Sequence, residues 1–201
     1  ALVPLTLDRA CFLTQLSGIA VPATLELRAA SGKKITSFTN STLFTHFGLS
    51  GPAVLDISRH LLTLAAPLGG PSRPEAPGLY LSVLPGQTVE SVDAALIELG
   101  QRPGKLSLLH LPNHLPPAHA DAERELRSNG LLAEGDRFRA APPERLLRAV
   151  CEHVKLDASM AASSLSRDAR RALAGALTQL RLPVTGDRGY NYAEVTAGGV
   201  P

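Results

Sequence analysis

A switch from strand to helix periodicity around Gly48 constrains the fold more than any other feature of this sequence. Residues 43–47 alternate as the two faces of a strand do, whereas the apolar residues of 54–62 recur at helical spacing. Gly48 permits a turn between the two, Ser50 is a good N-cap, and Pro52 suits a first helical turn. Because each buried apolar side chain contributes roughly 1.5–3 kcal/mol, the stretch predicts a strand, a turn and a helix packed on one core.

The start of this predicted helix is a candidate binding position. The backbone N–H groups of Gly51, Ala53 and Val54 would lack helical acceptors and would together carry about half a positive charge. An anion or the polar edge of a ligand would suit that position. The simpler interpretation is that Ser50 only caps a core helix, and the sequence leaves both interpretations open.

The first part of the chain is rich in strand patterns. After a short helix predicted over Asp8–Leu16, alternation predicts several strands, and a loop with four prolines and three glycines precedes the last of them. The predicted strands are 24–28, 34–38, 40–47 and 79–84, and the loop is 67–78. Short strands that follow one another closely favour a meander of mostly antiparallel pairs.

From Thr88 onward the pattern becomes helical. The predicted helices are 89–99, 118–126, 142–154 and 166–180, and 106–111 is predicted as a short helix or a turn. A turn-rich return over Leu182–Gly189 and a closing strand over Tyr190–Val200 would bring the chain back to the strand-rich part. We therefore predict an α+β fold, in which a β-barrel-like lobe of mostly antiparallel strands (1–87 plus 182–201) holds an inserted all-α lobe (88–181).

Composition narrows the range of partners. The 20 Lys and Arg against 18 Asp and Glu give a formal charge of +2, which is no strong field for nucleic acid or an anionic membrane. Aromatic residues make up 4% of the chain, so flat faces for stacking bases are few. No secretory signal or membrane span is visible, and the distant Cys11 and Cys151 indicate free thiols. We therefore expect a cytoplasmic protein whose partner is neither a membrane nor a nucleic acid.

Two familiar kinds of catalytic or metal site are not predicted. Prolines interrupt the run that contains His110, His114 and His119, so these side chains would not align on one helix face, and surface histidines are the preferred interpretation. The run Gly48–Gly51 resembles a hydrolase nucleophile elbow, but the Gly-x-Ser-x-Gly spacing fails because a glycine follows the serine directly. His46 and Asp56 show no recognisable triad pattern around that serine. We predict no metal ligands and no catalytic residue in this chain.

Phosphate binding has a weak signal. Four arginines form a basic stripe, although a solvated helix face explains them more simply: Arg167, Arg170, Arg171 and Arg181. No Gly-x-Gly-x-x-Gly or Walker loop is present. The sequence therefore predicts no dinucleotide or nucleotide phosphate cradle.

Two longer motifs resemble a known flavoprotein family. Thr45–Leu55 and Ala193–Val200 are similar to the paired signature of bacterial NAD(P)/FAD-dependent oxidoreductases of the aminoacetone-oxidase type. Leu2–Leu5, Leu16–Ile19 and Leu182–Gly186 resemble the same family, in the same order along the chain. In that family an FAD-binding domain is split by an insertion with a barrel-like part and a small helical part. This sequence resembles that insertion.

The resemblance implies a cofactor that this chain would meet only within a larger protein. FAD would be bound by the full-length protein, with NAD(P)H as a candidate reductant, and the isolated chain is expected to hold no FAD and to be inactive. The residues expected to contact the cofactor are Thr196, Gly198 and Gly199. The residues expected to face flavin or substrate are His46, Gly48, Ser50 and Gly51. Glycines at these positions would allow close approach to a flat ring, whereas Gly198–Gly199 turning a strand at a domain junction is the alternative.

The expected role is a capping insertion that lines the substrate cavity of an FAD-dependent oxidoreductase. Its partners would be the parent FAD-binding domain in cis and a small-molecule substrate that the resemblance does not name. A different class of function stays open, because short helices with exposed arginines would also suit a nucleic-acid- or protein-docking module on a β scaffold.

Two structural expectations follow from the insertion hypothesis. The chain begins at Ala1 and has its only methionine at Met160, so we expect it to be part of something longer. Residues 1–5 and 197–201 should then lie close together, since both would join one parent domain. An unpaired strand at Tyr190–Val200 would also allow a dimer through exposed strand edges.

Overall fold

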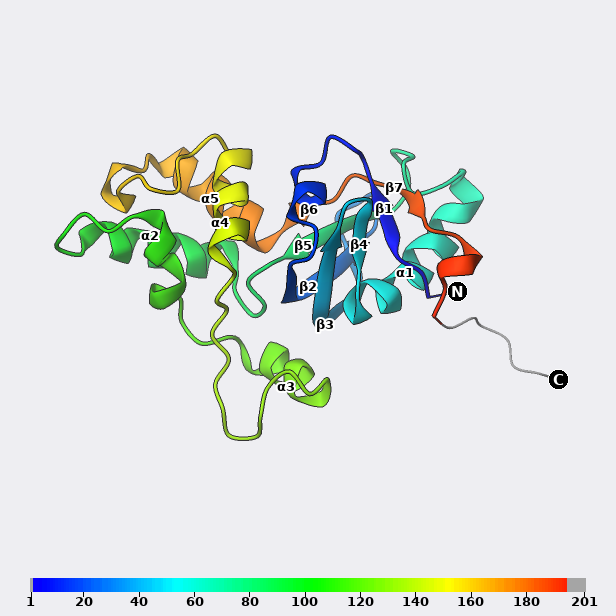
Figure 1. The fold of residues 1–201 in the computed structure, drawn as a ribbon, viewed down its shortest axis with the longest axis horizontal. Coiled ribbons are helices and arrows are strands. Elements are labelled where there is room, and N and C mark those ends of the chain that lie inside the picture. Colours follow the sequence, from blue (N-terminus) through cyan, green and yellow to red (C-terminus); the bar gives the residue numbers. More distant parts are fainter. Residues whose placement is uncertain (1, 195–201) are drawn as a thin grey trace. The chain divides into compact units, whose positions relative to one another are not determined.

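The computed structural model describes residues 2–194, with most strands in the first and last parts of the chain and most helices between them (Figure 1). Tertiary contacts divide the chain into two units, one made of residues 1–81 with 181–201 and the other of residues 82–180. We call these the sheet unit and the helical unit. Composition alone placed the two boundaries at 87/88 and 181/182. The predicted α+β fold class is confirmed.

Within the described residues, seven strands form one sheet in the order β6-β5-β2-β3-β4-β1-β7. Their bounds are β1 Leu5–Leu7, β2 Ala20–Arg28, β3 Lys34–Thr45, β4 Gly48–Ser50, β5 Gly78–Ser82, β6 Leu180–Arg181 and β7 Val184–Asp187. Strand β3 pairs antiparallel with β2 and β4, and strand β1 pairs antiparallel with β4 and β7. This order leaves β6 and β7 at the two edges of an open sheet.

The β2–β3 hairpin contains the longest strands of the sheet. Every second residue of β2 is buried, from Val21 to Leu27, as a strand with one face on a core requires. The prediction of two strands at 34–38 and 40–47 was wrong, because β3 continues without a break through Thr39. Thr39 lies opposite Thr24 in the ladder, and the two hydroxyl groups share a hydrogen bond of 2.9 Å. Cross-strand pairing therefore keeps this polar stretch extended.

Helix α1 (Pro52–Ala65) packs against the β2–β3 hairpin. Its buried side chains recur at helical spacing and include Val54, Ile57 and Leu61. Each contributes roughly 1.5–3 kcal/mol of burial, so α1 and the hairpin stabilise one another. The strand and helix predicted around Gly48 are both present, although a further strand, β4, takes the place of the turn.

The start of α1 differs from the prediction. Ser50 is the last residue of β4, opposite Leu43 in β3, and the N-cap is Gly51, with φ +92° and no side-chain cap. Pairing with β3 holds Ser50 in the strand and thereby removes it from the capping position. The N–H groups of Val54 and Leu55 both donate to the Gly51 carbonyl at 3.0 Å, so the prediction of a free Val54 N–H was wrong.

Capping residues define the ends of several helices in the helical unit. The helices of this unit are α2 Val89–Gln101, η3 Leu108–His114, α3 Ala120–Ser128, α4 Glu144–His153, η4 Ala162–Ser164 and α5 Arg167–Thr178. Ser166 caps α5 as predicted, accepting a hydrogen bond from the Ala169 N–H at 3.2 Å. The short helix or turn predicted over 106–111 is the 3-10 helix η3, which contains Pro112, where the prediction had ended it. Among the helices of residues 2–194, none combines the length and the apolar character needed to span a bilayer.

The predicted arginine stripe is correct only in part. Arg167 and Arg171 are exposed on α5, but Arg170 is half-buried and its Nε donates to Asp93 of α2 at 2.6 Å. Arg181 lies in β6 and is therefore not part of α5. The prediction of an exposed stripe is wrong for Arg170, because its partner Asp93 is remote in the sequence.

The last part of the described chain also differs from the prediction. The expected turn over 182–189 contains strand β7, which pairs with β1. No sequence pattern had indicated strand β1. Strands of three or four residues offer too few alternations to be detected. The described start of the predicted closing strand is the 3-10 helix η5 (Tyr190–Tyr192), whereas residues 195–200 lie outside the described residues.

Two further 3-10 helices belong to the sheet unit. The helix predicted over 8–16 is the shorter η1 (Phe12–Leu16), and η2 (Ala66–Leu68) follows α1 directly. The Asp8 carboxylate accepts a hydrogen bond from the Ala10 N–H at 2.8 Å, which forms a turn before η1. Local side-chain bonding therefore competes with a longer helix at this point.

Candidate functional site

The four residues expected to face flavin or substrate lie close together at the β3–β4 turn and the start of α1. His46 is exposed in the turn, Gly48 and Ser50 lie in β4, and Gly51 caps α1. The three other expected residues, Thr196, Gly198 and Gly199, lie outside the described residues. No ligand role is tested by these positions, and the assignment of all seven stays a prediction.

The two glycines of this segment have a clear structural reason. Gly48 has φ +150°, and a Cβ atom there would collide with the carbonyl oxygen of Leu5 and lie 2.9 Å from the Leu7 nitrogen. A Cβ atom at Gly51, which has φ +92°, would lie 2.9 Å from the Ser41 carbonyl oxygen. Neighbouring backbone fills both spaces, so neither glycine opens a cradle for a flat ring.

An aromatic cluster lies beside the β3–β4 turn, and sequence reasoning missed most of it. We define it as His46, Phe47, Arg188 and Tyr192. The His46 and Phe47 rings meet edge to face with centroids 5.2 Å apart. The Arg188 guanidinium lies 4.4 Å from the Phe47 centroid and 4.1 Å from the Tyr192 centroid, close enough for cation–π attraction to both rings. With Tyr192 54% exposed and neighbouring Tyr190 74% exposed, this is an unusual surface for a chain with few aromatic residues.

The first and the last described segments of the sheet unit run side by side next to this cluster. The Arg188 N–H donates to the Pro4 carbonyl at 3.1 Å, and the Glu194 N–H donates to the Leu2 carbonyl at 3.2 Å. Residues 197–201, which were expected to lie close to residues 1–5, lie outside the described residues. Residues 2–4 and 188–194 are nevertheless neighbours.

A hollow of about 570 Å³ opens elsewhere in the sheet unit. We call it the arginine hollow, and it is lined by Asp8, Leu61, Pro71, Ser72, Arg73, Pro74, Pro77, Gly78, Leu79, Arg181, Leu182, Pro183, Val184 and Thr185. Its size is within the usual range of small-ligand sites. It brings together the proline-rich loop and the β6–β7 connection, which the sequence pattern had described only as loop and turn.

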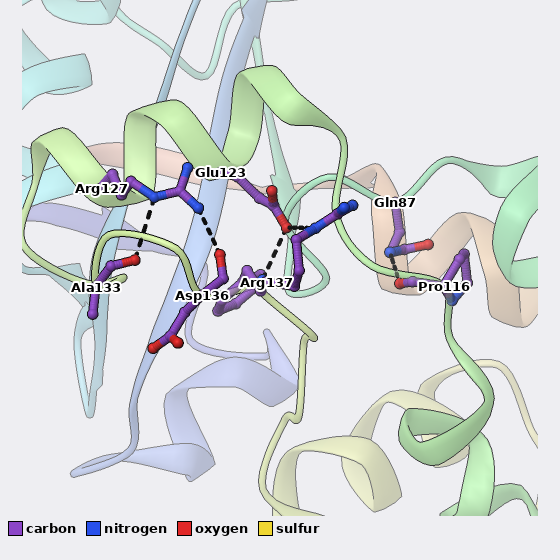
Figure 2. Close-up of polar contacts among 8 residues, drawn as sticks. Gln87, Pro116, Glu123, Arg127, Ala133, Asp136 and Arg137 are labelled. Atoms are coloured by element: carbon purple, nitrogen blue, oxygen red, sulfur yellow. Dashed lines mark hydrogen bonds and ion pairs between the residues drawn. The ribbon is translucent and has the colours of Figure 1, made fainter.

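In the helical unit, the strongest polar centre is Glu123 of α3 (Figure 2). The Glu123 residue is 5% exposed. Its carboxylate accepts hydrogen bonds at 2.9 Å from the Phe138 N–H and from Arg137 Nε. These bonds, the first above all, hold the pKa of Glu123 below its usual value, against the opposing effect of burial. Arg127 donates to the carbonyl oxygens of Ala133 and Asp136 and so fixes the same loop.

The polar groups around Glu123 are thus used to fold the segment after α3. Figure 2 shows Arg137 and Arg127 directed at carboxylate and carbonyl oxygens of the chain itself. In the segment before α3, the Gln87 side-chain amide donates a hydrogen bond to the Pro116 carbonyl at 2.8 Å. An ion-paired, internally satisfied network of this kind explains a fold better than it explains a binding site.

The histidine run and the serine of the β3–β4 segment gather no catalytic or metal-binding partners. Across residues 2–194, no three His, Cys, Asp or Glu side chains come together in a way that would hold a metal ion. His110 bonds locally, through Nδ1, to Ser107 of the same turn. Among the described residues, Ser50 forms no hydrogen bond with His46 or Asp56, so the geometry provides no triad.

Comparison with known proteins adds three findings. A family model described as HI0933-like protein barrel and H2TH domain matches residues 1–121. The chain is 52% identical over 61 residues to the ribosomal RNA dihydrouridine synthase of Haemophilus influenzae, covering 30% of this chain and 14% of that protein. It is 29% identical over 202 residues to the ribosomal RNA dihydrouridine synthase of Escherichia coli, covering 99% of this chain and 38% of that protein.

These matches differ in extent. The chain spans well under half the length of either curated relative. The family match covers more than half of this chain, including the strands β1 to β5, helix α1 and helix α2. The chain therefore belongs to the family of the HI0933-like protein barrel and H2TH domain.

Proposed function

We propose that this chain is the barrel and helical portion of a flavin-dependent enzyme that reduces uridine in ribosomal RNA to dihydrouridine. The observation that carries the proposal is the alignment of 99% of the chain with the E. coli ribosomal RNA dihydrouridine synthase. The aminoacetone-oxidase-type resemblance points to the same kind of flavin chemistry with a different substrate. The curated relatives favour RNA over that smaller substrate.

The chemistry implied by the relatives' name requires a reductant. Conversion of uridine to dihydrouridine adds two electrons and two protons across the C5–C6 double bond of the base. A flavin reduced by NAD(P)H supplies a hydride for such a step. In this proposal the reaction belongs to the larger protein, and this chain shapes the space that receives the RNA.

The described residues supply a surface for the flavin-bearing part, not a flavin cradle. The spaces beside Gly48 and Gly51 are filled by the chain's own backbone, which speaks against these two glycines as a flavin seat. His46 is exposed beside them and stays a candidate for facing the flavin or the base. The flavin would accordingly be held mainly by protein outside the segment aligned here.

The neighbouring positions of Leu2 and Glu194 support an insertion in a parent domain. A chain that leaves one domain and returns to it needs its two connections side by side, and these residues are joined by a backbone hydrogen bond. The aromatic cluster adjoins these two segments, because its member Arg188 contacts the Phe47 ring and donates its backbone N–H to the Pro4 carbonyl. We therefore propose the aromatic cluster as part of the contact with the parent domain in cis.

Nucleic acid was not an expected partner on the basis of net charge, and the proposal departs from that expectation. Net charge describes the field far from the surface, whereas a base is recognised by local contacts. The docking-module alternative thus becomes part of the same proposal: the helical unit would help to hold RNA. The exposed Arg167 and Arg171 of α5 are the observation that favours this role.

The direct test uses the full-length protein. Its visible spectrum should show flavin bands, and deletion of its gene should remove a dihydrouridine from ribosomal RNA, detected by mass spectrometry of nucleosides. Purified protein with NADPH or NADH should restore that residue in RNA from the deletion strain. Full-length protein that binds flavin but leaves all RNA uridines unchanged, while oxidising a small amine or other metabolite, would contradict the RNA part of the proposal.

A further inference from the structure

We propose that the arginine hollow is a phosphodiester-binding subsite, in which Arg73 and Arg181 hold the backbone of the RNA substrate. This inference rests on the proposed function and adds to it the position and the chemistry of one contact. It starts from two guanidinium groups that the sheet unit leaves without acidic partners.

Both arginines line the hollow and are exposed. Within residues 2–194, neither side chain has an ion pair or a hydrogen bond, whereas Arg28 is paired with Glu26 and Arg188 lies between two rings. Asp8 is the only acid of the lining, and one of its oxygens already accepts from the Ala10 N–H. The hollow therefore has a surplus of positive charge and donors.

Two glycines leave room for the guanidinium groups. The Nε atom of Arg73 lies 3.3 Å from the position that a Cβ atom of Gly69 would take, and Nε of Arg181 lies 3.6 Å from the corresponding position at Gly78. The Arg73 guanidinium thus lies against Gly69, whereas the atom nearest to the Cβ position of Gly78 belongs to the Tyr80 ring, at 3.0 Å. Side chains at these glycines would compete with the arginines for the same space.

The frame of the hollow is held by backbone bonds and prolines. The Leu182 N–H donates to the Leu79 carbonyl at 2.8 Å, and the Asp8 N–H donates to the Pro183 carbonyl at 2.9 Å. The Ser72 hydroxyl donates to the Thr185 carbonyl at 3.4 Å and so ties the proline-rich loop to β7. Because prolines fix φ, the loop loses little additional entropy when a ligand binds.

A phosphodiester matches this arrangement better than an uncharged ligand does. Guanidinium groups bind phosphate oxygens through paired N–H donors, and contacts to the backbone position an RNA without reading its sequence. Other arginines of the chain are less available: Arg127 and Arg137 are bonded within the loop after α3, and Arg170 is paired with Asp93. The arginine hollow is therefore one of the described cavities, and it is lined by two arginines that have no acidic partner among the described residues.

The test measures binding of a fluorescein-labelled, single-stranded fragment of the substrate RNA to the full-length protein by fluorescence anisotropy. The variants are R73Q/R181Q, the charge-retaining R73K/R181K, and the control R102Q/R148Q, which removes two exposed arginines from helix-surface pairs with Glu98 and Glu144. Binding is measured from about 50 mM to about 200 mM salt, where phosphate contacts dominate the salt dependence.

We expect R73Q/R181Q to weaken binding about tenfold and to reduce the slope of log K against log salt by about 1.4, since each lost contact to a single strand removes about 0.7. R73K/R181K should keep most of the slope while binding less tightly, because Lys is a point charge without the paired donors of Arg. The control should change neither quantity. Inorganic pyrophosphate should compete with RNA for the wild-type protein and lose that effect in R73Q/R181Q.

Several outcomes would overturn the inference and identify its failure. If RNA is bound and reduced equally well by R73Q/R181Q, the subsite is wrong and the proposed function stands. If the wild-type protein neither binds nor reduces RNA, both are wrong. Loss of flavin instead of RNA affinity in R73Q/R181Q would assign the hollow to the cofactor's phosphates, and loss of RNA affinity only in R167Q/R171Q would place the RNA backbone on α5.

Discussion

The guanidinium of Arg170 and the carboxylate of Asp93 join helices α5 and α2 across 77 residues of sequence, with Nε and Oδ1 2.6 Å apart. Both side chains are less than a quarter exposed, at 19% and 23%. The two helices also pack against each other and bury apolar residues, including Leu96 of α2 and Leu173 of α5. Because its two charged groups must meet, this half-buried ion pair determines which face of α5 packs against which face of α2.

Arg170→Ala should lower the free energy of unfolding by about 1–2 kcal/mol, because it leaves the Asp93 carboxylate half-buried without its partner. The matched control is Arg148→Ala, which breaks the exposed i,i+4 pair with Glu144 and should cost about 0.3–0.5 kcal/mol. Urea unfolding followed by circular dichroism measures both. Equal losses in the two variants would show that burial adds nothing to the Arg170 pair.

Gly48→Ala should destabilise the protein by about 2–4 kcal/mol, because a Cβ atom would meet the Leu5 carbonyl in a backbone conformation that favours glycine. Gly175→Ala, inside α5 with no atom near its Cβ position, should instead stabilise the protein by about 0.5–1 kcal/mol. If the β1–β4 contact is as close as described, thermal unfolding should show a lower melting temperature for Gly48→Ala and a higher one for Gly175→Ala. A tolerated alanine at Gly48 would contradict that packing.

Glu123 should make stability depend on pH in the acid range. Its folded-state pKa is lowered, mainly by the Phe138 N–H, so its contribution is complete above the unfolded value of about 4.3 and is lost as the pH falls through the lower folded value. Wild-type protein should therefore lose its advantage over Glu123→Gln at low pH. Amide exchange at Phe138 should be faster in Glu123→Gln and unchanged in Glu134→Gln, an exposed position in the same loop.

Cys151 should be inert to thiol reagents while the protein is folded. Burial raises the pKa of its thiol to about 11, and also raises that of the half-buried Cys11, so little thiolate is present at neutral pH. Labelling with Ellman's reagent should be slow in the native protein and complete in denaturant. Comparison of Cys11→Ala with Cys151→Ala assigns the signal, and rapid native labelling of Cys151 would contradict its burial.

Local signals in the sequence predicted the helical unit well. Ser166 precedes a run with one apolar face, and the structure starts α5 there with the expected cap. Helix α4 was likewise indicated by the paired Pro142–Pro143 before an apolar face. Such features depend on residues within one or two turns, and a single sequence contains them.

Partners that are remote in the sequence explain the errors. Ser50 is chemically a good cap, but pairing with Leu43 keeps it in β4 and gives the capping position to Gly51. Arg170 has the spacing of an exposed face and is nevertheless taken by Asp93. In each case a tertiary contact outweighs a local preference worth at most about 1 kcal/mol.

The candidate site shows the same division. His46 and the glycines beside it could be selected from a short motif, because they lie in one segment. The arginine hollow could not, since Arg73 of the proline-rich loop and Arg181 of β6 are distant in the sequence and line one hollow only in the folded chain. Likewise, no spacing rule would place Arg188 between Phe47 and Tyr192.

The backbone hydrogen bond between Leu2 and Glu194 has a mechanical consequence. Polypeptide attached at these two points would emerge from adjacent positions, and together the two strands of chain would act as a double tether. A double tether resists twisting far more than a single flexible linker does, while still permitting a hinge about the line through both attachments. Movement of the sheet unit relative to such polypeptide would then follow one axis.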